Sequence, residues 1–170
     1  MAYGSKKVVI PPLGWELIKT GTFSNDINIT GLAGDSDKLW QLIIRARSTD
    51  PLAPALRFNG DAGANYNYIN HFAAVKSAAP YHDYNAVAGA TKLILSYVCC
   101  LNHLWDLIIS PVSGQKRIVT GHGAEETDAN MFGTNTYTGV WLNTANNITT
   151  INILTGPITA GEYWLFRQKS

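Results

Sequence analysis

Hydrophobic and polar residues alternate along several short segments of this chain, and the clearest of them is Lys38–Ser48. Successive side chains of a β-strand point to opposite faces, so alternation of this kind predicts a strand with one face in a core. One predicted face carries Trp40, Leu42, Ile44 and Ala46, and the other carries Gln41, Arg45 and Arg47 together with Leu39 and Ile43.

Further strand candidates are separated by glycine, proline and asparagine, which favour turns. They span residues 15–20, 22–30, 56–58, 66–72, 92–101, 104–110, 115–120, 137–143, 148–154 and 162–168. Residues 111–114 (PVSG) predict a four-residue hairpin loop between two of these strands. Residues 73–90 and 121–136 are expected to form long loops. The pattern as a whole predicts an all-β, jelly-roll-like antiparallel β-sandwich.

The chain of 170 residues fits a single domain, and its composition does not shift along the sequence. We predict a β-sandwich domain over residues 15–170, preceded by an extended arm over residues 1–14 in which the Pro11-Pro12 pair excludes helix. This arm either lies across a neighbouring subunit or is a frayed terminus. The candidate partner-binding residues in it are Val8, Val9, Ile10, Pro11 and Pro12.

Charged residues make up only 15% of the chain, below the roughly 25% typical of soluble domains. A weakly charged surface favours a subunit that is partly covered in an assembly. The 13 basic and 12 acidic residues nearly balance, which argues against nucleic acid or a membrane as a partner. Three arginines, Arg45, Arg47 and Arg57, are therefore interpreted as sources of ion pairs between subunits.

The sequence contains no secretory signal in residues 1–14 and no apolar run near the ~20 residues that a membrane-spanning helix needs. Both observations are compatible with a protein that is assembled in a cytoplasm.

No motif for catalysis, a cofactor or a metal ion is found. Asp61 and Asp83 are the pair to consider for glycoside cleavage, but Asp61 follows Asn59-Gly60 and is better explained by an Asx-type turn. No serine or cysteine lies in a nucleophile elbow. The four histidines lack the close spacing of a local metal motif, and His122 with the acidic residues after it lacks the alternation of a calcium loop. We expect a protein that is not an enzyme.

A cluster of aromatic and polar residues at 81–84 is the candidate ligand-binding loop. It consists of Tyr81, His82, Asp83 and Tyr84, which form either a ligand cluster or an ordinary polar loop. Tyrosine combines an apolar ring with a hydroxyl group and suits contacts to sugars or proteins. The five tryptophans all lie in predicted strands and are expected in the core or at subunit interfaces.

Separated segments of the chain match one known pattern. They are RFNGDAGANYNY (57–68), LWDLIISPVSGQKRIVTGHG (104–123) and GVWLNTANNITTINILTGPITAGEYWLFR (139–167). In their order and content they resemble a family of small virion proteins of tailed bacteriophages, over roughly residues 38–168. The terminal EYWLFRQKS departs from the Leu-Tyr-Gly type of ending expected in that family.

The resemblance implies a β-sandwich of jelly-roll type that assembles as a homotrimer within a virion. Its partners would be copies of itself and the major capsid protein or another virion protein. The implied function is that of a capsid decoration (cement) or head-fibre subunit. The alternative is a tail-fibre tip or receptor-binding protein that recognises a carbohydrate on the host surface.

Overall fold

Twelve β-strands make up most of the part of the chain that the computed structural model describes, which is residues 13–52, 54–76, 79–95, 100–128, 131–155 and 160–169. In chain order they are β1 (Trp15–Phe23), β2 (Ile27–Thr30), β3 (Trp40–Leu52), β4 (Ala55–Phe58), β5 (Tyr66–Lys76), β6 (Ala79–Ala90), β7 (Leu93–Ile94), β8 (Cys100–Ile109), β9 (Arg117–Asp128), β10 (Met131–Trp141), β11 (Thr150–Leu154) and β12 (Ala160–Gln168).

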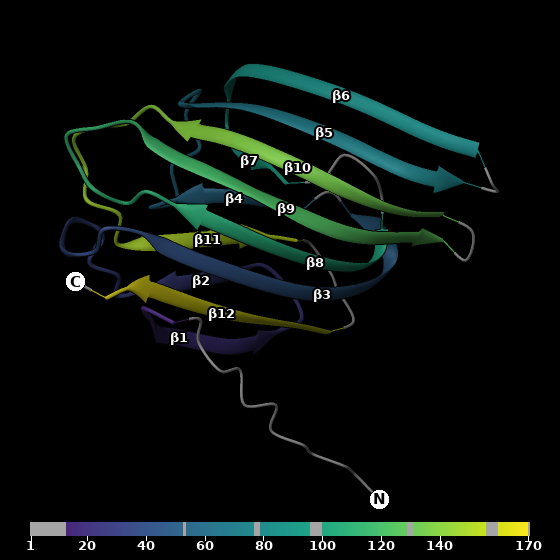
Figure 1. Cartoon of the computed structure of the whole chain (residues 1–170). Helices are drawn as coiled ribbons and strands as arrows, with labels where there is room; N and C mark the ends of the chain where they lie inside the picture. The colour runs from purple at the N-terminus through teal and green to yellow at the C-terminus, as the bar shows by residue number, and fades with distance from the viewer. Residues whose placement is uncertain are drawn as a thin grey trace, which may run out of the picture.

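The strands form two antiparallel sheets that pack as a sandwich (Figure 1). The larger sheet has eight strands in the order β1-β12-β3-β8-β9-β10-β5-β6, and the smaller sheet has four in the order β2-β11-β4-β7. Without β5, β6, β9 and β10, the orders become β1-β12-β3-β8 and β2-β11-β4-β7. Eight strands paired in this way form the double-sheet jelly roll. The predicted fold class is therefore confirmed.

The remaining four strands extend the larger sheet beyond the jelly roll. Strands β5 and β6 are inserted between β4 and β7, and β9 and β10 between β8 and β11. The predicted hairpin appears as the antiparallel pair β8–β9, but residues 110–116 connect it rather than the four residues expected. The added strands double the width of the larger sheet and leave it much wider than the sheet that packs on it.

The core lies between the two sheets. The alternation predicted for β3 is confirmed, because its four predicted core residues are buried while Arg45 and Arg47 are exposed. Two further tryptophans are buried. Trp105 belongs to β8, which flanks the extension, and Trp141 belongs to the added strand β10. The fully buried large side chains are Trp40, Trp105, Trp141, Arg117, Tyr66, Phe58, Phe72, Phe166, Ile29, Leu42, Ile44 and Leu56.

The prediction of long loops at 73–90 and 121–136 is wrong, because both segments are mainly strand. Their glycines suggested loops, but two of them lie under aromatic rings within the sheet. A Cβ atom on Gly123 would lie 2.5 Å from the ring of Trp105, and one on Gly133 would lie 2.4 Å from the ring of Phe72. Glycine is required there because another backbone or ring approaches closely.

The predicted strand over residues 92–101 is also only partly correct. The structure has the short strand β7 at Leu93–Ile94, residues 96–99 lie outside the described residues, and Cys100 already belongs to β8. Most of the predicted arm, residues 1–12, also lies outside the described residues. The first described strand, β1, begins at Trp15. Among the described residues, no helix has the length and apolarity to span a membrane.

Candidate functional site

The Asn59 turn (residues 58–61) lies at the end of β4, and hydrogen bonds hold it against the residues at the start of β11. Asn59 has a φ of 53° and Gly60 a φ of 69°, a left-handed conformation that asparagine and glycine tolerate. The side-chain oxygen of Asn59 accepts hydrogen bonds from the backbone N–H groups of Thr149 (2.9 Å) and Thr150 (3.0 Å), and its amide donates to the carbonyl of Asn147 (2.7 Å). The turn therefore holds together two segments about 90 residues apart in sequence.

Asp61 continues this network and has a structural role. Its carboxylate accepts hydrogen bonds from the indole N–H of Trp141 (2.7 Å), the backbone N–H of Gly63 (2.9 Å) and the side-chain amide of Asn65 (3.0 Å). The bond from Gly63 is the Asx-type turn that the sequence predicts. Burial by itself would raise the pKa of Asp61. The hydrogen bonds from Trp141, Gly63 and Asn65, together with the charge of Arg57, outweigh burial and lower the pKa.

We predict that Asp61→Asn flattens the acid dependence of stability. A carboxylate whose pKa is lowered in the folded state stabilises the fold above its unfolded pKa of about 3.9, and this contribution is lost as pH falls through the folded-state value. Urea unfolding of both proteins at pH 6 and at pH 3 measures the effect. The wild type should lose more stability than Asp61→Asn between these pH values, and equal losses would contradict the prediction.

Tyr66 completes the motif on the side of β5. Its hydroxyl accepts a hydrogen bond from the backbone N–H of Phe58 (3.0 Å) and donates to the carbonyl of Asp61 (3.2 Å). Burial is the main cause that raises the pKa of Tyr66 to about 12, so the hydroxyl stays protonated. The RFNGD…NY segment is thus a structural junction.

Asp61 and Asp83 are too far apart to act as a catalytic pair. Asp61 bonds to Trp141, which pairs with Tyr66 at the start of β5, whereas Asp83 pairs with Phe72. Six residues of strand separate these two positions on β5, a distance of about 20 Å. The carboxyl groups of glycosidases lie roughly 5–10 Å apart.

The candidate ligand residues at 81–84 lie in the edge strand β6, so the prediction of a loop is wrong. Successive residues of a strand face opposite ways, so the side chains of His82, Asp83 and Tyr84 do not converge. His82 and Tyr84 share one face of the larger sheet, and Asp83 lies on the other. His82 stacks on His71 of β5 with ring centroids 6.1 Å apart. Whether these residues bind a ligand stays a prediction.

The described residues after His122 do not form the loop that the sequence predicts. They lie in β9, in which Glu125 is buried and Glu126 is exposed on the opposite face. Within the described ranges, no three His, Cys, Asp or Glu side chains lie close enough together to hold a metal ion. The arm residues Val8, Val9, Ile10, Pro11 and Pro12 lie outside the described residues, and their partner-binding role stays a prediction.

The three arginines proposed for ion pairs between subunits lie on different sheets. Arg57 belongs to β4 of the smaller sheet and donates to the carbonyl of Thr91. Arg45 and Arg47 belong to β3 and point to the face of the larger sheet that is turned away from the core, here called the outer face. In the described part of the chain, neither of these two arginines forms an ion pair.

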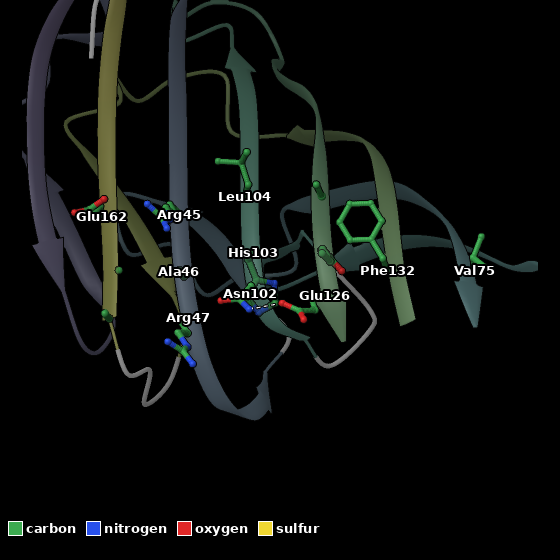
Figure 2. Close-up of a pocket in the computed structure, with 14 residues that line it drawn as sticks. Arg45, Ala46, Arg47, Val75, Asn102, His103, Leu104, Glu126, Phe132 and Glu162 are labelled. Atoms are coloured by element: carbon green, nitrogen blue, oxygen red, sulfur yellow. Dashed lines mark hydrogen bonds between the residues drawn. The ribbon is translucent and has the colours of Figure 1, made fainter. Parts of the chain in front are cut away.

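A groove of about 910 Å³ lies on the outer face. It runs across six strands, from β12 to β5. Figure 2 shows Arg45 and Arg47 on β3, Asn102 and Leu104 on β8, and Phe132 on β10 along this groove. The side-chain amide of Asn102 donates to the carboxylate of Glu126 across the groove floor. The groove therefore combines charged, amide and apolar side chains in one trough.

The outer face as a whole, including the groove, is partly apolar. Six of the eight large hydrophobic side chains that are exposed among the described residues lie on it, with exposed fractions from 46% for Ile69 to 64% for Tyr84. They are Ile69, Val75, Tyr84, Leu104, Ile118 and Phe132. Two smaller hollows, of about 250 Å³ and 490 Å³, are lined by neighbouring outer-face residues.

The sequence analysis missed several of these residues because they lie in the two segments interpreted as loops. Val75 falls in residues 73–90 and Phe132 in residues 121–136. The sequence did contain a usable signal, which is the alternation of residue types within the segment itself. Every second position of β10 is occupied by Phe132, Thr134, Thr136 and Thr138. No described strand covers these side chains, so the outer face is the candidate functional surface.

Comparisons with known proteins add little. No family model matches the chain, and no curated protein matches it. Among solved structures it is similar to a protein of unknown function from Shewanella oneidensis MR-1. The identity is 9%, the match covers 92% of this chain and 77% of that one, and the TM-score is 0.22. A likeness this weak supports no statement about fold or function.

Proposed function

We propose that this chain is a non-enzymatic structural protein of a tailed-bacteriophage virion, most simply a capsid decoration or head-fibre subunit. It would act by binding copies of itself and neighbouring particle proteins. The observation that carries the proposal is the outer face of the larger sheet, an eight-stranded surface with exposed apolar side chains and no covering layer among the described residues.

A surface of this kind suits contact with proteins. Contiguous exposed apolar patches on soluble domains mark interaction sites, and here six large hydrophobic side chains share one face with threonines and charged residues. Burying them in an assembly would remove apolar area from water. The low content of charge in the whole chain points in the same direction.

The jelly-roll order of strands is compatible with this function but does not select it. Double-sheet jelly rolls occur in viral capsid proteins, in lectins and in cupins, so fold alone does not identify a function. The virion assignment draws on the resemblance of three separated segments, of which RFNGDAGANYNY is now explained as a structural junction. The alternative, a receptor-binding tip, would use loops at 81–84 and 121–136 as its ligand surface, but both segments are mainly strand.

The proposal predicts that the chain is a stoichiometric part of purified phage particles. We expect it to remain with particles through density-gradient purification, and quantitative mass spectrometry should give its copy number. A decoration subunit should reach on the order of hundreds of copies, since repetition multiplies weak contacts. A few to tens of copies would indicate a fibre or tail component. Absence from particles, with the chain present in the lysate, would refute the virion function.

A further inference from the structure

The outer-face residues form rows that run across the strands, because the register of every pair is known. From β12 to β5, the first row is Ala160, Arg47, Asn102, Glu126, Phe132 and Val75. The second is Glu162, Arg45, Leu104, Ala124, Thr134 and Ala73. The third is Trp164, Ile43, Asp106, His122, Thr136 and His71.

These rows carry side chains of both signs, namely two arginines and three carboxylates. Arg45 and Arg47 lie on the β3 side, and the outer-face carboxylates are Glu162, Asp106 and Glu126. Neither arginine has an ion-pair partner in the described part of its own chain. A face that carries both signs at separate positions can bind an identical face, provided that like charges do not coincide.

We propose that the outer face binds the outer face of a second copy of this chain, with a two-fold axis that runs parallel to the strands between β8 and β9. The inference deepens the proposed function, since it takes the same surface and names its partner. This axis passes through the centre of the eight-stranded sheet. It therefore places β8 opposite β9, β3 opposite β10, β12 opposite β5 and β1 opposite β6, and all eight strands overlap.

Each row then contains at least one favourable contact between the two copies. In the third row, Asp106 faces His122 of the second copy, which is a hydrogen-bonding pair. In the first row, Arg47 faces Phe132 of the second copy, a cation–π arrangement, and Val75 enters the groove over Ala160. In the second row, Leu104 lies against Ala124. No position in the three rows brings two like charges together.

Neighbouring two-fold axes do not give this result. An axis along β8 places Asp106 against the same residue of the second copy, and an axis along β9 does the same for Glu126. Like-charge contacts are costly, so the central axis is favoured over these two.

The area of the face is sufficient for a stable dimer. Eight strands about 4.8 Å apart and about eight residues long cover about 900 Å² per copy. The pair would bury about 1,800 Å² in total, within the range of specific protein interfaces. A three-fold ring would instead need two different patches on each chain, because a heterologous contact joins unlike surfaces.

The test uses Thr134, an exposed position that faces Arg45 of the second copy. Thr134→Arg creates a like-charge contact twice per dimer, and we expect the dissociation constant of the dimer to rise about a hundredfold. Thr134→Glu creates an opposite-charge contact and should strengthen the dimer. Thr30→Arg is the matched control, since Thr30 is an exposed strand threonine on the smaller sheet. Sedimentation equilibrium of the full chain at low salt measures each constant.

A double variant separates the contact from any effect on folding. Arg45→Glu with Thr134→Arg restores an opposite-charge pair and should return the dimer toward wild-type affinity. Circular dichroism of every variant verifies the fold. The inference is overturned if the wild type is monomeric or trimeric, or if Thr134→Arg behaves like Thr30→Arg. A dimer with the expected response in a chain that is absent from particles would uphold the inference and refute only the virion function.

Discussion

Replacing Trp141 by alanine is expected to lower the free energy of unfolding by about 4 kcal/mol, since truncation of a buried tryptophan costs 3–5 kcal/mol. Trp141 is fully buried, and its ring lies 5.4 Å from that of Phe58 and 6.4 Å from that of Tyr66, between centroids. The guanidinium of Arg117 lies over the ring at 5.3 Å. The substitution also removes the indole donor to Asp61, so packing and a hydrogen bond are lost together.

Urea unfolding monitored by circular dichroism measures this effect, with Trp15→Ala as the matched control. Trp15 is only half-buried, at the start of the edge strand β1, and its truncation should cost about 1 kcal/mol. A loss at Trp141 no greater than the loss at Trp15 would mean that the aromatic junction contributes little to the stability of the sandwich.

The second large effect is expected at Asn59, where alanine should cost about 4 kcal/mol. Part of the loss comes from the hydrogen bonds to residues 147–150, at about 1 kcal/mol for each bond. The rest comes from the backbone, because a residue with a Cβ at a φ of 53° is strained by roughly 1–2 kcal/mol unless it is asparagine or aspartate.

Asn59→Gly distinguishes the two contributions. Glycine accepts the left-handed conformation but makes no side-chain bonds, so it should be less damaging than alanine by about 1 kcal/mol. Equal unfolding free energies for the two variants would exclude the backbone contribution. If Asn59→Gly were as stable as the wild type, the hydrogen bonds from Asn59 to residues 147–150 would contribute little to stability.

The Asn59 turn shows where prediction from sequence succeeds. A turn at Asn59-Gly60-Asp61 could be predicted because its cause is local: these residue types tolerate left-handed backbone and bond to nearby N–H groups. The partners of the turn could not be predicted, since Trp141 and Thr149 lie 80 and 90 residues further along the chain.

The strands β5, β6, β9 and β10 show where it fails. Residues 73–90 and 121–136 are rich in alanine, glycine and polar residues, which usually indicate loops. Their inner positions need little side-chain volume, because the rings of Trp105 and Phe72 from neighbouring strands cover Gly123 and Gly133. This covering comes from another strand, so no local pattern reports it.

The sequence by itself determined that this protein is an all-β sandwich, because alternation along a single strand decides which side chains enter the core. The sequence also located the Asn59 turn and the buried face of β3. Only the tertiary structure decided that the added strands widen one sheet and that Arg47, Glu126 and Phe132 lie in one row. The physical reason is that a row across a sheet depends on the register between strands, and register is set by contacts between distant segments.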